Sequence, residues 1–155
     1  MPVIVVGADT HLGSAVVDAL LPHRGELRAF VTDPEVGRTL QARGVKVAVG
    51  DISDGSHVGG AARQTFCAVL VPAAASDERE RSFADSPEAV IAAWVEGLRD
   101  GGVRRAIWLD DGSIPAGADL VRPAAPEFAA VPATGRSADE VAADVARLET
   151  ARSLT

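Results

Sequence analysis

The sequence contains no tyrosine, and aromatic residues make up only 4% of the chain. Without tyrosine, no mechanism can use a tyrosine hydroxyl as general acid, which removes one route to carbonyl reduction. Cys67 is the only cysteine, so no intrachain disulfide can form. Its place in the apolar run 67–71 predicts a buried thiol rather than a reactive one.

Lysine is also scarce, and acidic residues outnumber basic ones. Lys46 is the only lysine, and the formal net charge is −7. Nucleic-acid binding needs clustered Lys and Arg to neutralise phosphates, so the composition excludes such a partner. No apolar run approaches the roughly 20 residues of a membrane span, and the chain opens into apolar residues 3–6 without a basic leader. We therefore expect a cytoplasmic protein with no membrane partner. The three histidines lack metal-ligand spacing, so we expect no metal site.

Apolar residues alternate between two patterns along the chain. Short β-branched runs are typical of parallel strands buried on both faces, and apolar residues three and four positions apart are typical of helices. The predicted strands comprise residues 3–6, 27–31, 45–49, 68–71 and 106–109. The predicted helices comprise residues 12–21, 34–43, 56–63, 87–100 and 138–152.

Five alternations of strand and helix predict a doubly wound parallel sheet of about five strands. The expected fold class is therefore α/β, a three-layer α/β/α domain of the Rossmann type that comprises residues 1–155. Residues 112–136 are rich in Pro, Ala and Gly without periodicity, which predicts a long loop. The charged run 77–81 predicts a solvated surface segment.

The segment Gly7-Ala8-Asp9-Thr10-His11-Leu12-Gly13 joins the first predicted strand to the first predicted helix. Rossmann domains place the pyrophosphate of a dinucleotide here, because the free amides and the dipole of the helix N-terminus both favour an anion. Gly7 would permit the tight turn, and Gly13 the close packing of helix on strand. The alternative is a turn that merely requires two glycines.

At this point the chain resembles the atypical short-chain dehydrogenases, and within them the small NmrA-like NAD(P)H-binding proteins of the NADH-flavin reductase type. The resemblance covers essentially the whole chain, and its motifs indicate a family without specifying a substrate. The segments that carry it are Gly7-Ala8 with Gly13, Phe30-Val31-Thr32-Asp33-Pro34, residues 44–51, Gly102-Val103-Arg104-Arg105, Asp111-Gly112-Ser113, residues 118–121 and Pro126-Glu127-Phe128.

The resemblance implies a binding site for NAD(P)H. The implied residues are Gly7, Asp9, Thr10, His11, Leu12 and Gly13 for the pyrophosphate, Asp51 and Ile52 for the adenine, and Val71, Pro72 and Ala73 for the nicotinamide ribose.

Departures from the family pattern bear on the choice of cofactor. Thr10 stands where the family loop has a third glycine, so a side chain lies where phosphate would approach the backbone. Thr32 stands where the family has an arginine for the 2′-phosphate of NADP, and it cannot make that bidentate contact. Asp33 would repel the same phosphate, unless it serves only as a helix cap. These departures favour NAD over NADP, and they equally fit weakened binding.

Hydride transfer from a reduced nicotinamide to FMN, FAD or a quinone depends mainly on positioning. The sequence therefore predicts an NAD(P)H-dependent oxidoreductase with a flavin- or quinone-like acceptor. The candidate catalytic residues are His11, beside the cofactor, and Asp110 and Ser113, after the fifth predicted strand. The alternative for the last two is a solvated loop without a catalytic role.

The resemblance also implies a further strand after the last helix, which would begin where the sequence ends at Ser153-Leu154-Thr155. The substrate site would then be open, completed by a second subunit, or lost. The alternative function is therefore a non-catalytic dinucleotide sensor or protein-interaction module. An exposed helix face carrying Trp94 would permit a homodimer, and a core position for Trp94 is the other interpretation.

Overall fold

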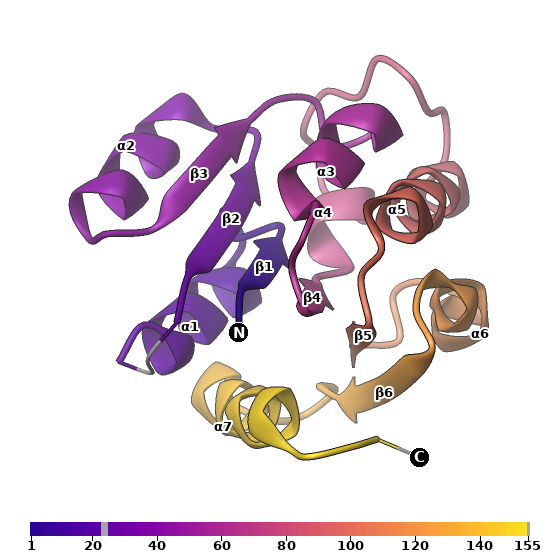
Figure 1. Cartoon of the computed structure of the whole chain (residues 1–155). Helices are drawn as coiled ribbons and strands as arrows, with labels where there is room; N and C mark the ends of the chain where they lie inside the picture. The colour runs from indigo at the N-terminus through magenta and orange to yellow at the C-terminus, as the bar shows by residue number, and fades with distance from the viewer. Residues whose placement is uncertain (23–24, 155) are drawn as a thin grey trace.

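The computed structural model describes residues 1–22 and 25–154, and within them it contains one six-stranded parallel sheet with helices on both faces (Figure 1). The strand order is β3-β2-β1-β4-β5-β6, which is the order of the Rossmann fold. The predicted fold class is therefore confirmed.

The strands are β1 (Val3–Val6), β2 (Leu27–Val31), β3 (Lys46–Val49), β4 (Cys67–Leu70), β5 (Arg105–Asp110) and β6 (Glu127–Pro132). The helices are α1 (His11–Leu20), α2 (Pro34–Ala42), α3 (Gly55–Ala62), α4 (Ala73–Ser76), α5 (Pro87–Gly101), α6 (Gly117–Val121) and α7 (Ala138–Thr150), with a 3₁₀ turn at Arg122–Ala124.

The long loop predicted for residues 112–136 is wrong, because this stretch contains α6, the 3₁₀ turn and β6. β6 pairs in parallel with β5, from Arg105 opposite Glu127 to Asp110 opposite Pro132. Its central alanines lack the β-branched side chains that mark a strand in sequence, so the pairing with β5, rather than local propensity, makes it a strand. The four-residue helix α4 also has no counterpart among the predicted elements.

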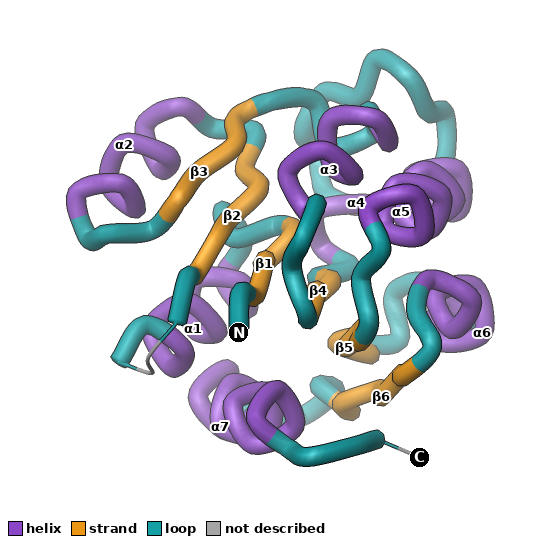
Figure 2. The backbone as a smooth tube through the Cα atoms, in the orientation of Figure 1, coloured by secondary structure: helices purple, strands orange, loops and turns teal. Residues whose placement is uncertain are grey.

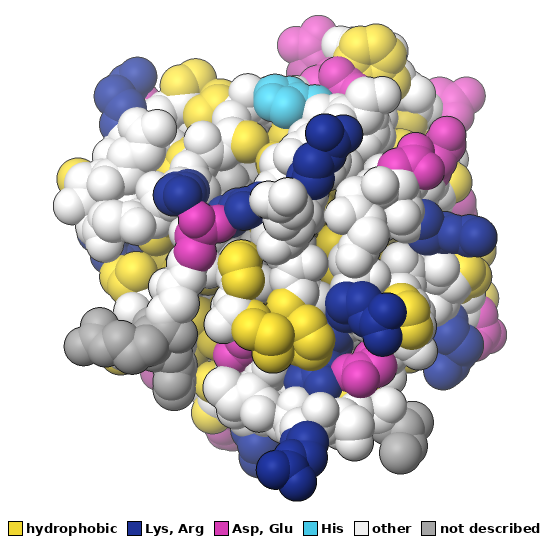
Figure 3. All heavy atoms as spheres, viewed as in Figure 1, with side chains coloured by type: hydrophobic (Ala, Val, Ile, Leu, Met, Phe, Trp, Pro, Cys, Tyr) yellow, Lys and Arg dark blue, Asp and Glu magenta, His cyan; other side chains and the backbone are white. Residues whose placement is uncertain are grey.

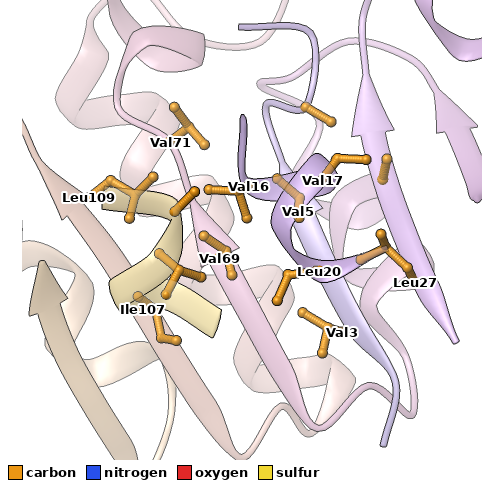
Figure 4. Packing of buried hydrophobic residues seen from close by; sticks show 14 of the residues in the cluster. Val3, Val5, Val16, Val17, Leu20, Leu27, Val69, Val71, Ile107 and Leu109 are labelled. Atoms are coloured by element: carbon orange, nitrogen blue, oxygen red, sulfur yellow. The ribbon is translucent and has the colours of Figure 1, made fainter. Parts of the chain in front are cut away.

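Two hydrophobic cores lie on opposite faces of the sheet. On one face, Val16 and Leu20 of α1 lie over Val5 and Val69 of the central strands (Figure 4). On the other face, α3, α5 and α6 bury a second cluster that contains Trp94 at 0% exposure. The helix face that carries Trp94 is therefore core, and it does not supply the exposed surface that would have paired two subunits.

Charge on the surface is mixed. On the face shown in Figure 3, basic side chains are scattered among acidic ones rather than gathered into one patch. In the part of the chain that the structure describes, no helix is both long and apolar enough to cross a bilayer.

A buried arginine of β5 donates hydrogen bonds to the C-terminal end of α7. Arg105 is 0% exposed, and its Nη1 donates to the carbonyl oxygens of Leu148 (2.8 Å), Glu149 (3.1 Å) and Ala151 (2.7 Å). Its Nε donates to Glu127 of β6 at 2.7 Å. Carbonyl groups at the end of a helix lack partners within that helix, so Arg105 satisfies groups that would otherwise be unpaired. The helix that it fixes packs beside α1.

We predict that Arg105→Met lowers the free energy of unfolding by about 3 kcal/mol, because it leaves partly buried acceptors, among them the Glu127 carboxylate, without their donor. Urea unfolding at neutral pH measures this change. Arg104→Met is the matched control, since the neighbouring Arg104 is exposed and its replacement should stay within about 0.5 kcal/mol. A loss for Arg105→Met as small as that of the control would contradict the role given to Arg105.

Candidate functional site

The turn between β1 and α1 is tightly packed. Gly7 has φ +92°, a left-handed conformation that favours glycine, and its amide donates to the carbonyl of Phe30 at 3.0 Å. A Cβ atom on Gly7 would lie 2.8 Å from the Cβ of Ala74, and one on Gly13 would collide with the Gly7 carbonyl oxygen. Both glycines are therefore required, one for conformation and both for close packing.

Thr10 caps α1. Its Oγ1 accepts a hydrogen bond from the Gly13 amide at 3.0 Å and donates to the Gly7 carbonyl at 2.7 Å, and the Thr10 amide also donates to Gly7. The Thr10 amide is thus engaged inside the turn. The amides of His11 and Leu12 have no hydrogen-bond partner among the described residues. These two donors, at the positive end of the helix dipole, are suited to an anion.

The turn lies where the strand order reverses. From β1 the chain proceeds to β2 and β3 on one side, and it then returns to β4, β5 and β6 on the other side (Figure 1). Ligands of open α/β sheets bind in the crevice at this switch point. Val71, just after β4, borders the turn, because a Cβ on Gly7 would lie 3.2 Å from its Cβ. Pro72 and Ala73 follow it into α4.

A segment that we call the strap, residues 77–83, begins after α4 and extends toward the ends of the first three strands (Figure 2). Arg79 is its main anchor. The Arg79 Nη1 donates to Oδ1 of Asp9 at 2.9 Å and to Oγ1 of Thr32 at 3.2 Å. The side chains of Arg79 and Asp9 are only 11% and 4% exposed.

The second oxygen of Asp9 is also occupied. Oδ2 accepts hydrogen bonds from the backbone amides of Thr32 (2.8 Å) and Asp33 (3.1 Å), immediately after β2. Asp33 uses its own carboxylate to cap α2 by accepting from the Glu35 amide at 2.9 Å. Asp9 therefore joins the turn between β1 and α1 to the end of β2 and to the strap.

The far end of the strap is bound to the loop after β3. Oδ2 of Asp51 accepts from the Ser82 amide at 2.7 Å, and the Ser53 hydroxyl accepts from the Phe83 amide at 3.0 Å. Burial acts to raise the pKa of Asp51, but hydrogen bonds from Ser53 and Ser82 outweigh it and hold this pKa below its ordinary value. Asp51 is thus held as a carboxylate. Ile52 is buried, and its carbonyl accepts from Nε1 of Trp94 at 2.8 Å.

The sequence placed residues 77–81 on a solvated surface that borders the substrate side, but it did not predict the ion pair that the strap forms with the turn. The prediction of a solvated segment is wrong for Arg79 and Arg81, whose side chains are 11% and 13% exposed, although Glu78 and Glu80 are exposed. A usable signal was the alternation of basic and acidic residues from Arg79 to Arg81. Such alternation is compatible with the arginines turning inward and the glutamates outward.

The candidate catalytic residues lie at the same edge of the sheet, but they are not joined to one another. His11 is exposed at the start of α1. Asp110 ends β5, and its carboxylate accepts from the Gly112 amide at 3.1 Å. The exposed Ser113 donates its hydroxyl to Asp111. The catalytic assignment of His11, Asp110 and Ser113 stays a prediction.

Two surface cavities of about 390 and 430 Å³ lie beside α5, and neither is lined by a predicted site residue. Cys67 is buried, and burial raises the pKa of its thiol, as expected for an inert core residue. Within residues 1–22 and 25–154 no cluster of His, Cys, Asp and Glu could hold a metal ion. His23 lies outside the described residues.

Comparison with known proteins finds likeness of fold but none of sequence family. No protein-family model matches the sequence, and no curated protein matches it. Among solved structures, the chain is similar to triphenylmethane reductase of Citrobacter sp., with a TM-score of 0.79 and 17% identity, over 98% of this chain and 66% of that one. The same enzyme has been solved in complex with NADP(H).

Two proteins from Escherichia coli have the same fold. ChuY of strain O157:H7, described as an anaerobillin reductase, has a TM-score of 0.69 and 17% identity, over 99% of this chain and 92% of that one. The NADPH-dependent quinone oxidoreductase QOR2 has a TM-score of 0.65 and 18% identity, over 95% of this chain and 52% of that one. The chain therefore spans only part of the length of several neighbours. At these identities, the likeness shows a shared fold.

We predict that Ser53→Ala raises the pKa of Asp51 toward its ordinary value of about 3.9, because the variant loses the hydroxyl donor. In the wild type, the stabilisation by a lowered carboxyl pKa is present at neutral pH and is lost as pH falls through that pKa. An NMR titration of the Asp51 carboxyl carbon between pH 2 and 6 measures the shift. Ser56→Ala is the control, since Ser56 is exposed; an equal Asp51 pKa in both variants would refute the prediction.

Proposed function

We propose that the protein is an NAD(P)H-dependent oxidoreductase that transfers a hydride from nicotinamide to a flavin- or quinone-like acceptor. The observation that carries the proposal is the turn after β1. Gly7 and Gly13 allow its close packing, and the amides of His11 and Leu12 are free at the switch point of a Rossmann sheet. This arrangement suits the pyrophosphate of a dinucleotide.

The residues around the turn fit such a cofactor in part. His11 and Leu12 would hold the pyrophosphate through their amides, while Thr10 keeps the Gly13 amide for itself. Asp51 and Ile52 would border the adenine, and Val71, Pro72 and Ala73 the nicotinamide ribose. A bound reduced nicotinamide would supply the hydride. The contribution of this chain would then be to position the two reactants and to exclude water between them.

The comparisons support the class of reaction. The neighbours include a triphenylmethane reductase and a quinone oxidoreductase, and both are described with NADP(H) or NADPH. The likeness of sequence to the NADH-flavin reductase type points the same way. A reaction of this kind does not require the tyrosine that the chain lacks. The proposed acceptor is FMN, FAD or a quinone. The groups proposed to lie near it are His11, Asp110 and Ser113.

We further propose that NADH is preferred to NADPH. The end of β2 has Thr32 and Asp33 rather than a free arginine, and the nearby Arg79 is already paired with Asp9 and Asp77. A 2′-phosphate would meet carboxylates there without a free cation. The cytoplasm is the proposed compartment, in agreement with a single cysteine that forms no intrachain disulfide.

Isothermal calorimetry with NADH and NADPH tests binding, and oxidation of NADH in the presence of FMN or menadione tests turnover. The proposal predicts binding of NADH and acceptor-dependent loss of absorbance at the nicotinamide band. Binding without turnover with either acceptor would replace it with the dinucleotide-sensing or interaction module. Absence of binding at millimolar dinucleotide would refute both the oxidoreductase and the dinucleotide sensor.

A substitution of Thr10 tests the geometry of the turn. We predict that Thr10→Gly binds NADH about fivefold more tightly, because it frees the Gly13 amide for the pyrophosphate. The loss of the cap should lower stability by only a few tenths of a kcal/mol, since glycine is tolerated at this position. Thr10→Ser is the control, because it retains the hydroxyl that caps α1. If calorimetry gives the two variants the same affinity, Thr10 does not limit binding.

A further inference from the structure

The carboxylate of Asp9 is bound in the manner of a captured anion. One oxygen accepts from the amides of Thr32 (2.8 Å) and Asp33 (3.1 Å), and the other accepts from the Arg79 guanidinium at 2.9 Å. Two successive backbone amides and an arginine are donors that proteins use to bind phosphate and carboxylate groups. The Asp9 side chain is only 4% exposed. The protein's own carboxylate therefore fills this set of donors, which comprises two amides and the Arg79 guanidinium.

The donor set lies at the position that distinguishes the two nicotinamide cofactors. In Rossmann domains, residues at the end of the second strand contact the ribose hydroxyl of NAD or the 2′-phosphate of NADP. Thr32 and Asp33 are the residues that follow β2, and the Asp9 carboxylate reaches their amides from the turn between β1 and α1. The Asp9 carboxylate therefore occupies donors that would otherwise face a 2′-phosphate.

Other contacts would keep the donors in place without Asp9. Asp77 accepts from both Nε and Nη2 of Arg79, each at 2.8 Å, which fixes the direction of the guanidinium. The Asp77 carboxylate also forms an ion pair with Arg81, whose Nη2 lies 3.0 Å from Asp77 Oδ1. The four groups Asp9, Asp77, Arg79 and Arg81 are neutral together, so replacing Asp9 by a neutral residue leaves this cluster with one net positive charge.

We propose that Asp9 is a built-in substitute for the 2′-phosphate of NADP, and that it is the residue that makes the site selective for NADH. The proposal rests on the proposed dinucleotide binding. It also assigns a latent phosphate site to the amides of Thr32 and Asp33 and the guanidinium of Arg79, which the wild-type chain closes with its own carboxylate. The carboxyl group of Asp33 faces the start of α2, where it accepts from the Glu35 amide.

Asp9→Ser tests the proposal, because it removes the carboxylate and leaves the donors. Calorimetry should show that the ratio of the NADPH to the NADH dissociation constant falls by about tenfold or more relative to wild type. Inorganic phosphate should raise the melting temperature of this variant by more than it raises that of the wild type, which retains only the amides of His11 and Leu12 as free donors in the part of the site that the structure describes. Asp9→Ala, which also vacates the donor set, gives a second measurement in case the serine variant does not fold.

Two further variants are controls. Asp33→Ser removes a neighbouring charge and retains a residue that can cap α2, so it should lower the ratio much less than Asp9→Ser does. Asp9→Ser combined with Arg79→Met should lose the gain in affinity for both NADPH and phosphate. The role given to Asp9 would be overturned by either of two results. In one, the gain in NADPH affinity persists in the double variant without Arg79; in the other, Asp33→Ser shows an equal gain.

The outcomes separate this proposal from the proposed function. If the wild type binds NADH but the Asp9 variants gain neither NADPH affinity nor stabilisation by phosphate, the role of Asp9 is refuted and the function stands. If no chain binds a dinucleotide but phosphate stabilises the Asp9 variants more than the wild type, the latent site stands, while the dinucleotide function and the selectivity given to Asp9 fall. A wild type that prefers NADPH would overturn the selectivity given to Asp9.

Discussion

The contact between Gly7 and Gly13 holds the first turn of α1 against the end of β1, and the site depends on it. No side chain fits at either glycine, so helix and strand approach closely enough to direct the helix N-terminus at the edge of the sheet. Thr10 then closes the turn by capping the helix, and the amides of His11 and Leu12 remain as donors. The anion binding that we propose would thus depend on backbone geometry rather than on a basic side chain.

The strap makes this edge of the sheet an electrostatic network. Arg79 connects the turn between β1 and α1 to the end of β2. Asp51 connects the strap to the loop after β3. The carboxylates of Asp9, whose side chain is buried, and of Asp51, which is half-buried, hold these connections, and hydrogen bonds from amides and an arginine satisfy their oxygens. Because a buried charge is costly without partners, any ligand that enters here must replace the bonds that it breaks.

The sequence predicted the parts of the fold that local patterns encode. The strands near residues 3–6 and 67–71 are β-branched or apolar throughout, and Asp33 and Ser137 cap their helices where the pattern placed them. β6 was not predicted, because its central alanines have no strong preference for a strand and its backbone pairs with β5, a contact that no local pattern encodes. The ion pair of Arg79 with Asp9 joins residues 70 positions apart, so no local pattern encodes it. The tight glycine turn between β1 and α1 could therefore be predicted, whereas the network of ion pairs beside it could not.

The central claim is that the free amides at the start of α1 receive the anion of a dinucleotide. The most direct measurement is an amide NMR titration with NADH, in which each backbone N–H is observed separately. The account predicts that the His11 and Leu12 amides show the largest changes and shift downfield as they donate to phosphate oxygens. Saturable changes elsewhere, with these two amides unmoved, would contradict it.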